Sequence, residues 1–269
     1  MSKTKNNNNK SPNGVEKMPK HLADEFTNLT SSKHIPNYYE FIKKSDSDLI
    51  IEPENPNIKL HGIKIPSRGL IIAPSGTGKT NFLLHMLNCF NHGKGTFSSI
   101  QVICSSKAEP IYEFIEKRCP NVKITEGIDT IPKLSTENFD KKENHMIILD
   151  DLVLEKNQER ICKYYMACRK FNVTIFYLSQ KYFTVPIFIR QNATLLFLFH
   201  IGDSKKILSS MNLGLDIDTM MDVYKYAIKE NMTPLRINIT EKNIQKKFFK
   251  GLIEPIYIEE SDDETDSEK

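Results

Sequence analysis

The fold is decided by a glycine-rich loop between an apolar run and an apolar helical segment. The run is Gly69-Leu-Ile-Ile-Ala73, and the loop consists of Ala73, Pro74, Ser75, Gly76, Thr77, Gly78, Lys79 and Thr80. The glycines allow successive backbone N–H groups to turn inward around a phosphate, and the next helix N-terminus adds partial positive charge. A strand, such a loop and a helix, in this order, predict a phosphate-binding loop, or P-loop.

Two side chains of the loop have specific expected roles. Lys79 reaches the β- and γ-phosphates of a nucleotide, and the Thr80 hydroxyl coordinates Mg²⁺. ATP and Mg²⁺ are therefore the expected ligands, with residues 73–80 as the nucleotide-binding set. Ala73 stands where the strict pattern has glycine, which is tolerated where φ is negative.

A pair of carboxylates supplies the second half of the expected site. The apolar run His145-Met-Ile-Ile-Leu149 ends in Asp150 and Asp151. Asp150 is expected to bind Mg²⁺ together with Thr80, as the acid at the end of a buried strand does in P-loop enzymes. Asp151 is expected to orient and polarise the attacking water. The alternative for Asp151 is that it caps a following helix.

A third apolar run, Val173–Ser179, is followed by Gln180. The carboxyl ends of parallel strands face the ligand crevice of such sheets. Gln180 is therefore expected to contact the γ-phosphate or the attacking water. A plain surface glutamine is the alternative.

Strand-like and helix-like runs alternate along the chain and predict an α/β fold. A mainly parallel central sheet with helices on both faces is expected. Beyond residues 69–73, the expected strands are 100–104, 122–125, 146–149, 173–179 and 195–200, with 235–239 as an added edge strand. The main expected helices are 110–118, 156–171 and 216–229.

We expect four regions. Residues 1–35, rich in Asn and Lys, form a flexible arm, and residues 36–65 form an extension that packs on the core. Residues 66–250 form the P-loop ATPase domain, and residues 251–269 form an acidic tail. Positions 259–269 hold seven acids and one lysine, which gives this segment a charge of −6. The net charge of the whole chain is +3, so the remaining residues together carry +9. A basic remainder is compatible with a polyanionic partner or with a solvated surface.

Composition excludes several classes. No apolar run approaches the ~18–20 residues of a membrane span, and the polar N-terminus lacks a signal sequence. The five cysteines form no CxxC pair, which indicates reduced thiols rather than a disulfide framework or a zinc site.

Residues 167–180 and 185–194 resemble the FtsK–HerA superfamily of DNA-pumping ATPases. Within them, Tyr177-Leu-Ser-Gln-Lys-Tyr-Phe183 and Ile189-Arg-Gln-Asn192 are most similar to the genome-packaging ATPases of large nucleocytoplasmic DNA viruses and virophages, which include the poxvirus packaging ATPase. The resemblance spans about residues 66–240, with the P-loop, Asp150 and Gln180 in the family's order.

This resemblance implies a RecA-like core, assembled into a homo-oligomeric ring, usually a hexamer, that moves double-stranded DNA with ATP. It implies a capsid or portal component as docking partner, and a location in the host cytoplasm or virus factory, or with the virion. Gln180 is the implied sensor, and glutamate is commoner than aspartate at the position of Asp151. Such rings use an arginine from the neighbouring subunit, for which Arg190 is the first candidate and Arg169 the second.

Two groups of basic residues are candidates for DNA contact, with a solvated charged face as the alternative. The first group forms a stripe along one expected helix and consists of Lys156, Arg160, Lys163 and Lys170. The second group is interleaved with phenylalanines and consists of Lys242, Lys246, Lys247 and Lys250.

Two other functions use the same loop: a P-loop kinase or NTPase acting on a small molecule, and a non-catalytic ATP-binding scaffold. The first does not account for Gln180 or the Ile189–Asn192 run. The second does not account for the intact set of Lys79, Thr80, Asp150 and Gln180. A GTPase is disfavoured because the guanine-reading NKxD motif does not occur.

Overall fold

The computed structural model describes residues 19–30, 35–46 and 49–258. The chain divides into two compact units, residues 1–52 and 53–269, and each is described by itself.

The first unit contains two helices, α1 (Lys20–Thr30) and α2 (Tyr38–Ser45). The Phe26 ring of α1 lies 5.4 Å from the Phe41 ring of α2, and Lys44 pairs with Glu25 at 3.3 Å. The Asn37 side chain caps α2 by accepting a hydrogen bond from the Tyr39 N–H. Residues 20–30 thus differ from the flexible arm expected over residues 1–35, because the aromatic contact with α2 offsets their ordering entropy. Residues 1–18 lie outside the described residues.

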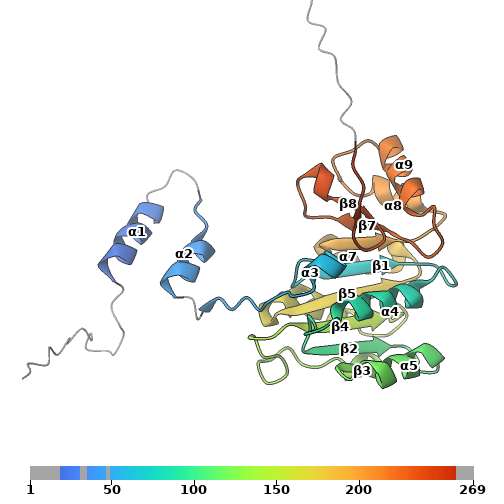
Figure 1. The fold of residues 1–269 in the computed structure, drawn as a ribbon, viewed down its shortest axis with the longest axis horizontal. Coiled ribbons are helices and arrows are strands. Elements are labelled where there is room, and N and C mark those ends of the chain that lie inside the picture. Colours follow the sequence, from blue (N-terminus) through green and yellow to red (C-terminus); the bar gives the residue numbers. More distant parts are fainter. Residues whose placement is uncertain (1–18, 31–34, 47–48, 259–269) are drawn as a thin grey trace, which may run out of the picture. The chain divides into compact units, whose positions relative to one another are not determined.

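The second unit is built on a sheet whose nine described strands run in the order β3-β2-β4-β5-β1-β6-β7-β8-β9. Figure 1 labels the strands from β3 to β8 in this order, apart from β6. The first six are parallel: β1 (Arg68–Ile72), β2 (Ser99–Cys104), β3 (Val122–Glu126), β4 (His145–Asp150), β5 (Val173–Ser179) and β6 (Leu195–Leu198). The last three are antiparallel: β7 (Leu235–Asn238), β8 (Phe248–Lys250) and β9 (Glu254–Pro255). The predicted mainly parallel sheet is confirmed.

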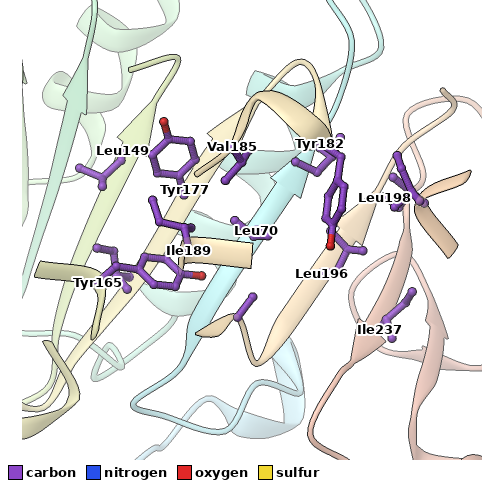
Figure 2. Packing of buried hydrophobic residues seen from close by; sticks show 14 of the residues in the cluster. Leu70, Leu149, Tyr165, Tyr177, Tyr182, Val185, Ile189, Leu196, Leu198 and Ile237 are labelled. Atoms are coloured by element: carbon purple, nitrogen blue, oxygen red, sulfur yellow. The ribbon is translucent and has the colours of Figure 1, made fainter. Parts of the chain in front are cut away.

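Helices cover both faces of the sheet, as predicted. Alternate residues of β1 belong to opposite cores: Ile71 packs with α4 (Lys79–Phe90) and α5 (Pro110–Arg118), and Leu70 and Ile72 pack in the other cluster. That second cluster includes α6 (Gln158–Ala167), α7 (Ile187–Asn192), α8 (Ser204–Ser209) and α9 (Ile217–Ala227). Figure 2 shows Leu70, Tyr177 and Leu196, from three neighbouring strands, on the same side as Ile189 of α7. Both helical layers therefore pack on β1, which lies inside the sheet of the second unit.

Short 3₁₀ turns complete these elements. They are Ile128–Thr130, Cys168–Phe171, Tyr182–Thr184 and Ile244–Lys246. The second of them continues α6, so the single helix expected over residues 156–171 is a shorter α-helix followed by a 3₁₀ turn. Asn172, in the left-handed region at φ 52°, ends it before β5.

From residue 53 onward, the segment before β1 packs within the second unit. It contains α3 (Ile58–His61). The Asn57 side chain donates to the Phe90 and His92 carbonyls at 3.1 and 2.8 Å, and the buried Arg236 donates to the carbonyls of His61 and Gly62. The extension expected over residues 36–65 is thus divided, because α2 belongs to the other unit.

The C-terminal boundary also differs from the expectation. Leu252 and Ile256 are buried and β9 pairs with β8, so the ordered core continues beyond residue 250. The acidic positions 259–269 lie outside the described residues. The prediction that residues 235–239 form an edge strand is wrong, because β7 lies between β6 and β8. Short strands after Lys247 complete the sheet, and their few residues carry too little pattern to be recognised in the sequence.

Candidate ATPase site

The P-loop connects the carboxyl end of β1 to the N-terminus of α4. The Ala73 N–H donates to the Ser179 carbonyl at 3.0 Å, and the Thr77 hydroxyl donates to the Pro74 carbonyl at 2.7 Å. Gly76 and Gly78 adopt φ of 78° and 96°, in the left-handed region, which glycine enters without strain. Ala73 is not among the described residues with positive φ, so alanine costs nothing at this position.

Lys79 lies between the two carboxylates. Its Nζ is 2.9 Å from Oδ1 of Asp150 and 2.6 Å from Oδ2 of Asp151. Burial alone would lower the pKa of Lys79, but the two carboxylates outweigh burial and raise it. The cation that a triphosphate requires is therefore held charged, at the N-terminus of α4, by the two acids at the carboxyl end of β4.

Asp150 is 2% exposed and ends β4. Its Oδ2 accepts a hydrogen bond from the Tyr112 hydroxyl at 2.7 Å. Burial, and then the Asp150 charge, raise the pKa of Tyr112, so the phenol remains a donor. Tyr112 was missed in the sequence. It lies in the first turn of α5, directly after β2, and Cys104 at the end of β2 is in register with Asp150. The expected neighbourhood of these two strand ends was the sequence signal that could have pointed to Tyr112.

Asp151 and Gln180 meet across neighbouring strands. Asp151 adopts φ 53°, and the Gln180 side-chain amide donates to its Oδ2 at 3.3 Å. The next helix, α6, begins at Gln158 with Asn157 at its N-cap position. Asp151 therefore does not cap that helix, and its carboxylate stays directed at Lys79. Non-glycine residues at positive φ cost energy and occur preferentially at functional sites.

A cavity of about 640 Å³ opens over these groups, within the ~300–1,000 Å³ of typical ligand pockets. Its lining combines P-loop residues with Asp151, Gln180, Glu109 and Met232. A larger groove of about 930 Å³ lies between α4 and α5, but its lining contains neither Lys79 nor a carboxylate. The smaller cavity is the one with phosphate-binding chemistry.

The two candidate arginines lie outside the lining of this cavity. The Arg190 Nε donates to the Val185 carbonyl at 3.0 Å, and its guanidinium lies 5.2 Å from the Tyr182 ring and 5.5 Å from the Phe183 ring. Arg169 is exposed and precedes β5, whereas the P-loop follows the carboxyl end of β1. A role for either at a γ-phosphate requires a neighbouring subunit.

The basic groups proposed for DNA contact are partly engaged within the chain. Arg160 pairs with Asp129 at 3.1 Å, and Lys163 pairs with Glu159 at 2.6 Å. Lys247 is buried and donates to the Leu213 carbonyl at 3.0 Å, and Lys250 pairs with Glu230. The residue 242–250 group is therefore not the continuous free basic patch that the sequence suggested.

No helix of the described residues has the length and apolar character to span a membrane. Taken together, the parallel sheet, the P-loop and the Lys79–Asp150–Asp151–Gln180 set define a P-loop ATPase.

The chain belongs to the poxvirus A32 protein family, whose model matches residues 62–248. The match contains the P-loop, both aspartates, Gln180 and both arginines. Among curated proteins, none matches the chain.

The fold is also that of the genome packaging NTPase B204 from Sulfolobus turreted icosahedral virus 2. The structure of B204 with AMP is 11% identical with a TM-score of 0.51, and the one with sulfate is 10% identical with a TM-score of 0.50. Each match covers 71% of this chain and 100% of B204. At this identity the likeness shows a shared fold.

Proposed function

We propose that this protein is the ATPase of a motor that packages a viral double-stranded DNA genome into a capsid. Membership of the poxvirus A32 family supports this role, as does the fold shared with an NTPase described as genome-packaging. The observation that carries the proposal is the convergence of Lys79, Asp151 and Gln180 within hydrogen-bond distance at one cavity.

ATP binding rearranges this set. The triphosphate offers Lys79 a denser negative charge than two carboxylates, so the Nζ moves from Asp150 and Asp151 to the phosphates. Backbone N–H groups of residues 75–80 surround the β-phosphate, and the N-terminus of α4 adds its partial charge. Release from Lys79 frees Asp151 to interact with water.

Mg²⁺ fits the donor set that Lys79 leaves. Asp150 is a buried carboxylate with one oxygen held by Tyr112, and Thr80 supplies a hydroxyl at the start of α4. Across residues 19–30, 35–46 and 49–258, no group of three or more His, Cys, Asp or Glu is arranged to hold a metal. A site with one carboxylate and one hydroxyl suits Mg²⁺, which takes its other ligands from phosphates and water. The bound ion would neutralise charge on the β- and γ-phosphates.

Hydrolysis then needs an activated water. The water oxygen forms a bond to the γ-phosphorus, the bond to the β-bridging oxygen breaks, and ADP leaves. Asp151 accepts the proton of the water. The Gln180 amide, which donates to Asp151 in this structure, orients the same carboxylate and the water.

We further propose a homo-oligomeric ring, with a hexamer favoured, in which Arg190 or Arg169 of one subunit contacts the γ-phosphate held by the next. Double-stranded DNA is the transported partner, and a capsid or portal component is the docking partner. The proposed location is the host cytoplasm or virus factory, or the virion.

The test is ATP hydrolysis by the purified protein with and without long double-stranded DNA, beside Lys79→Ala. Lys225→Ala, which changes an exposed lysine paired with Asp222, is the matched control. DNA is expected to raise a rate that only Lys79→Ala abolishes. Robust hydrolysis that ignores DNA would favour an NTPase acting on a small molecule. Nucleotide binding without hydrolysis would favour the scaffold.

A further inference from the structure

Met232 combines an unusual backbone conformation with contact to the P-loop. It lies in the connection between α9 and β7, adopts φ 60° and is 46% exposed. A large apolar side chain in the left-handed region is strained, and such strain is concentrated at functional sites.

The Met232 side chain lies against the loop backbone. A Cβ built on Gly78 would lie 2.6 Å from Met232 Cγ and 2.8 Å from its Cβ. The Asn81 side-chain amide lies 3.6 Å from the Met232 sulfur. Any side chain larger than hydrogen at position 78 would therefore collide with Met232.

The connection that carries Met232 is anchored to β8. Lys250 pairs with Glu230, and the Gly251 N–H donates to the Pro234 carbonyl at 2.8 Å. The Thr233 N–H donates to the Glu230 carbonyl at 3.3 Å. These contacts hold Met232 in place from both sides of the connection.

Three cavities adjoin the P-loop and the first turn of α4, and Met232 lines all three. The first, of about 640 Å³, contains Lys79 and Asp151. The second, of about 370 Å³, contains Gly76 and His200, and the third, of about 250 Å³, contains Asn81 and Leu252. A triphosphate seated on the P-loop has these three cavities beside it to receive its nucleoside. Whichever it enters, Met232 forms part of the wall.

We infer that Met232 is the residue against which the nucleoside of the bound nucleotide packs, a nucleoside-positioning residue contributed by the α9–β7 connection. The flexible, polarisable thioether packs well on a flat aromatic ring such as a purine. This inference rests on the proposed ATP-binding function of the site. It predicts that Met232 contributes to the affinity for nucleotides and not to the affinity for the phosphate chain alone.

The test compares two probes by calorimetry: ATP, and inorganic tripolyphosphate, which lacks the nucleoside. Met232→Ala is expected to weaken ATP binding about tenfold, the effect of losing most of one apolar packing surface, and to leave tripolyphosphate binding unchanged. Met232→Leu keeps an apolar wall and is expected to bind ATP like the wild type. Ile253→Ala, a similarly exposed apolar residue outside the linings of these cavities, is the matched control.

A second substitution guards against misfolding. Met232→Asn removes the apolar wall but introduces a residue that tolerates the left-handed backbone, and the same split between probes is expected. Equal weakening of both probes would show that Met232 only supports the P-loop, and unchanged ATP binding would show no contact; either result overturns the inference while the ATPase function stands. A wild-type protein that binds neither probe would overturn the proposed function itself.

Discussion

The Lys79 ammonium lies 2.6 Å from the Asp151 carboxylate. The lysine of the phosphate loop is thus paired with the proposed catalytic acid, and a second carboxylate, that of Asp150, lies 2.9 Å from the same ammonium. This arrangement keeps a buried cation and a buried anion compensated. It also makes nucleotide entry an exchange of partners, in which Lys79 leaves the acids as the phosphates arrive.

Removing the Asp151 carboxylate while keeping its shape tests that exchange. Asp151→Asn is expected to lower kcat by roughly 10²–10³-fold, a typical loss for a group that acts at the reacting water. ATP affinity is expected to rise rather than fall, because the Asp151 carboxylate no longer competes with the phosphates for Lys79. Steady-state kinetics and calorimetry measure the two quantities separately. Asp151→Glu, which restores a carboxylate, is the matched control; if it is as inactive as Asp151→Asn, the carboxylate is not the water-activating group.

Tyr112 is expected to act through Asp150. Tyr112→Phe removes the 2.7 Å hydrogen bond to a buried carboxylate, which costs about 1.5–3 kcal/mol when the acceptor is charged. The Mg²⁺ concentration that gives half the maximal ATPase rate should rise, because Asp150 loses the group that orients it. Tyr257→Phe, at an exposed tyrosine, should leave that concentration unchanged. An unaltered Mg²⁺ dependence in Tyr112→Phe would exclude the orienting role.

His61 is expected to make stability fall on acidification. The Ile63 N–H donates to its Nδ1 at 3.0 Å, so the folded protein holds a neutral ring, and burial, followed by the nearby Arg236, lowers its pKa to about 4. In the unfolded chain the pKa is about 6.5. The unfolded state therefore binds more protons between these values, and the free energy of unfolding falls as pH drops from about 6.5 toward about 4.

The full loss corresponds to roughly 3 kcal/mol. Between pH 7 and pH 5 about 2 kcal/mol of this loss is expected, and urea denaturation at the two pH values measures it. His61→Asn should be less stable at pH 7 and should lose less stability between the two pH values. A wild type and a variant with the same pH slope would show that other groups carry the acid sensitivity.

The proposed action of Arg190 on the nucleotide of a neighbouring subunit is best tested in assemblies that mix two variants. Arg190→Ala is expected to retain ATP binding and to lose at least about 100-fold of the DNA-stimulated rate, as removal of an arginine finger does. Mixing Arg190→Ala with Lys79→Ala subunits should recover part of that rate, because an intact site on one subunit then meets an intact arginine on the next. Arg169→Ala treated in the same way is the control. Recovery with Arg169→Ala instead would identify the second candidate.

Local pattern was sufficient for the parts of the site that are contiguous in the chain. The run from Gly69 to Thr80 predicts a strand, a turn and a helix without reference to any other segment. Asp150 and Gln180 were found because each lies at the carboxyl end of a buried strand, and parallel strands bring these ends to one edge. The sequence left two roles open for Asp151, water activation and capping of the next helix. The capping role is excluded because α6 begins at Gln158 with Asn157 at its N-cap position.

The sequence by itself determined the class of fold, the phosphate loop and the acids beside it, because each follows from spacing within one strand or turn. Only the tertiary structure decided that Tyr112 holds Asp150, that Met232 packs on Gly78 and that β7 lies inside the sheet. These contacts join segments 38 residues apart in the first case and about 150 in the second, where Asn81 also meets Met232. They depend on which surfaces pack together, and no local periodicity records that choice.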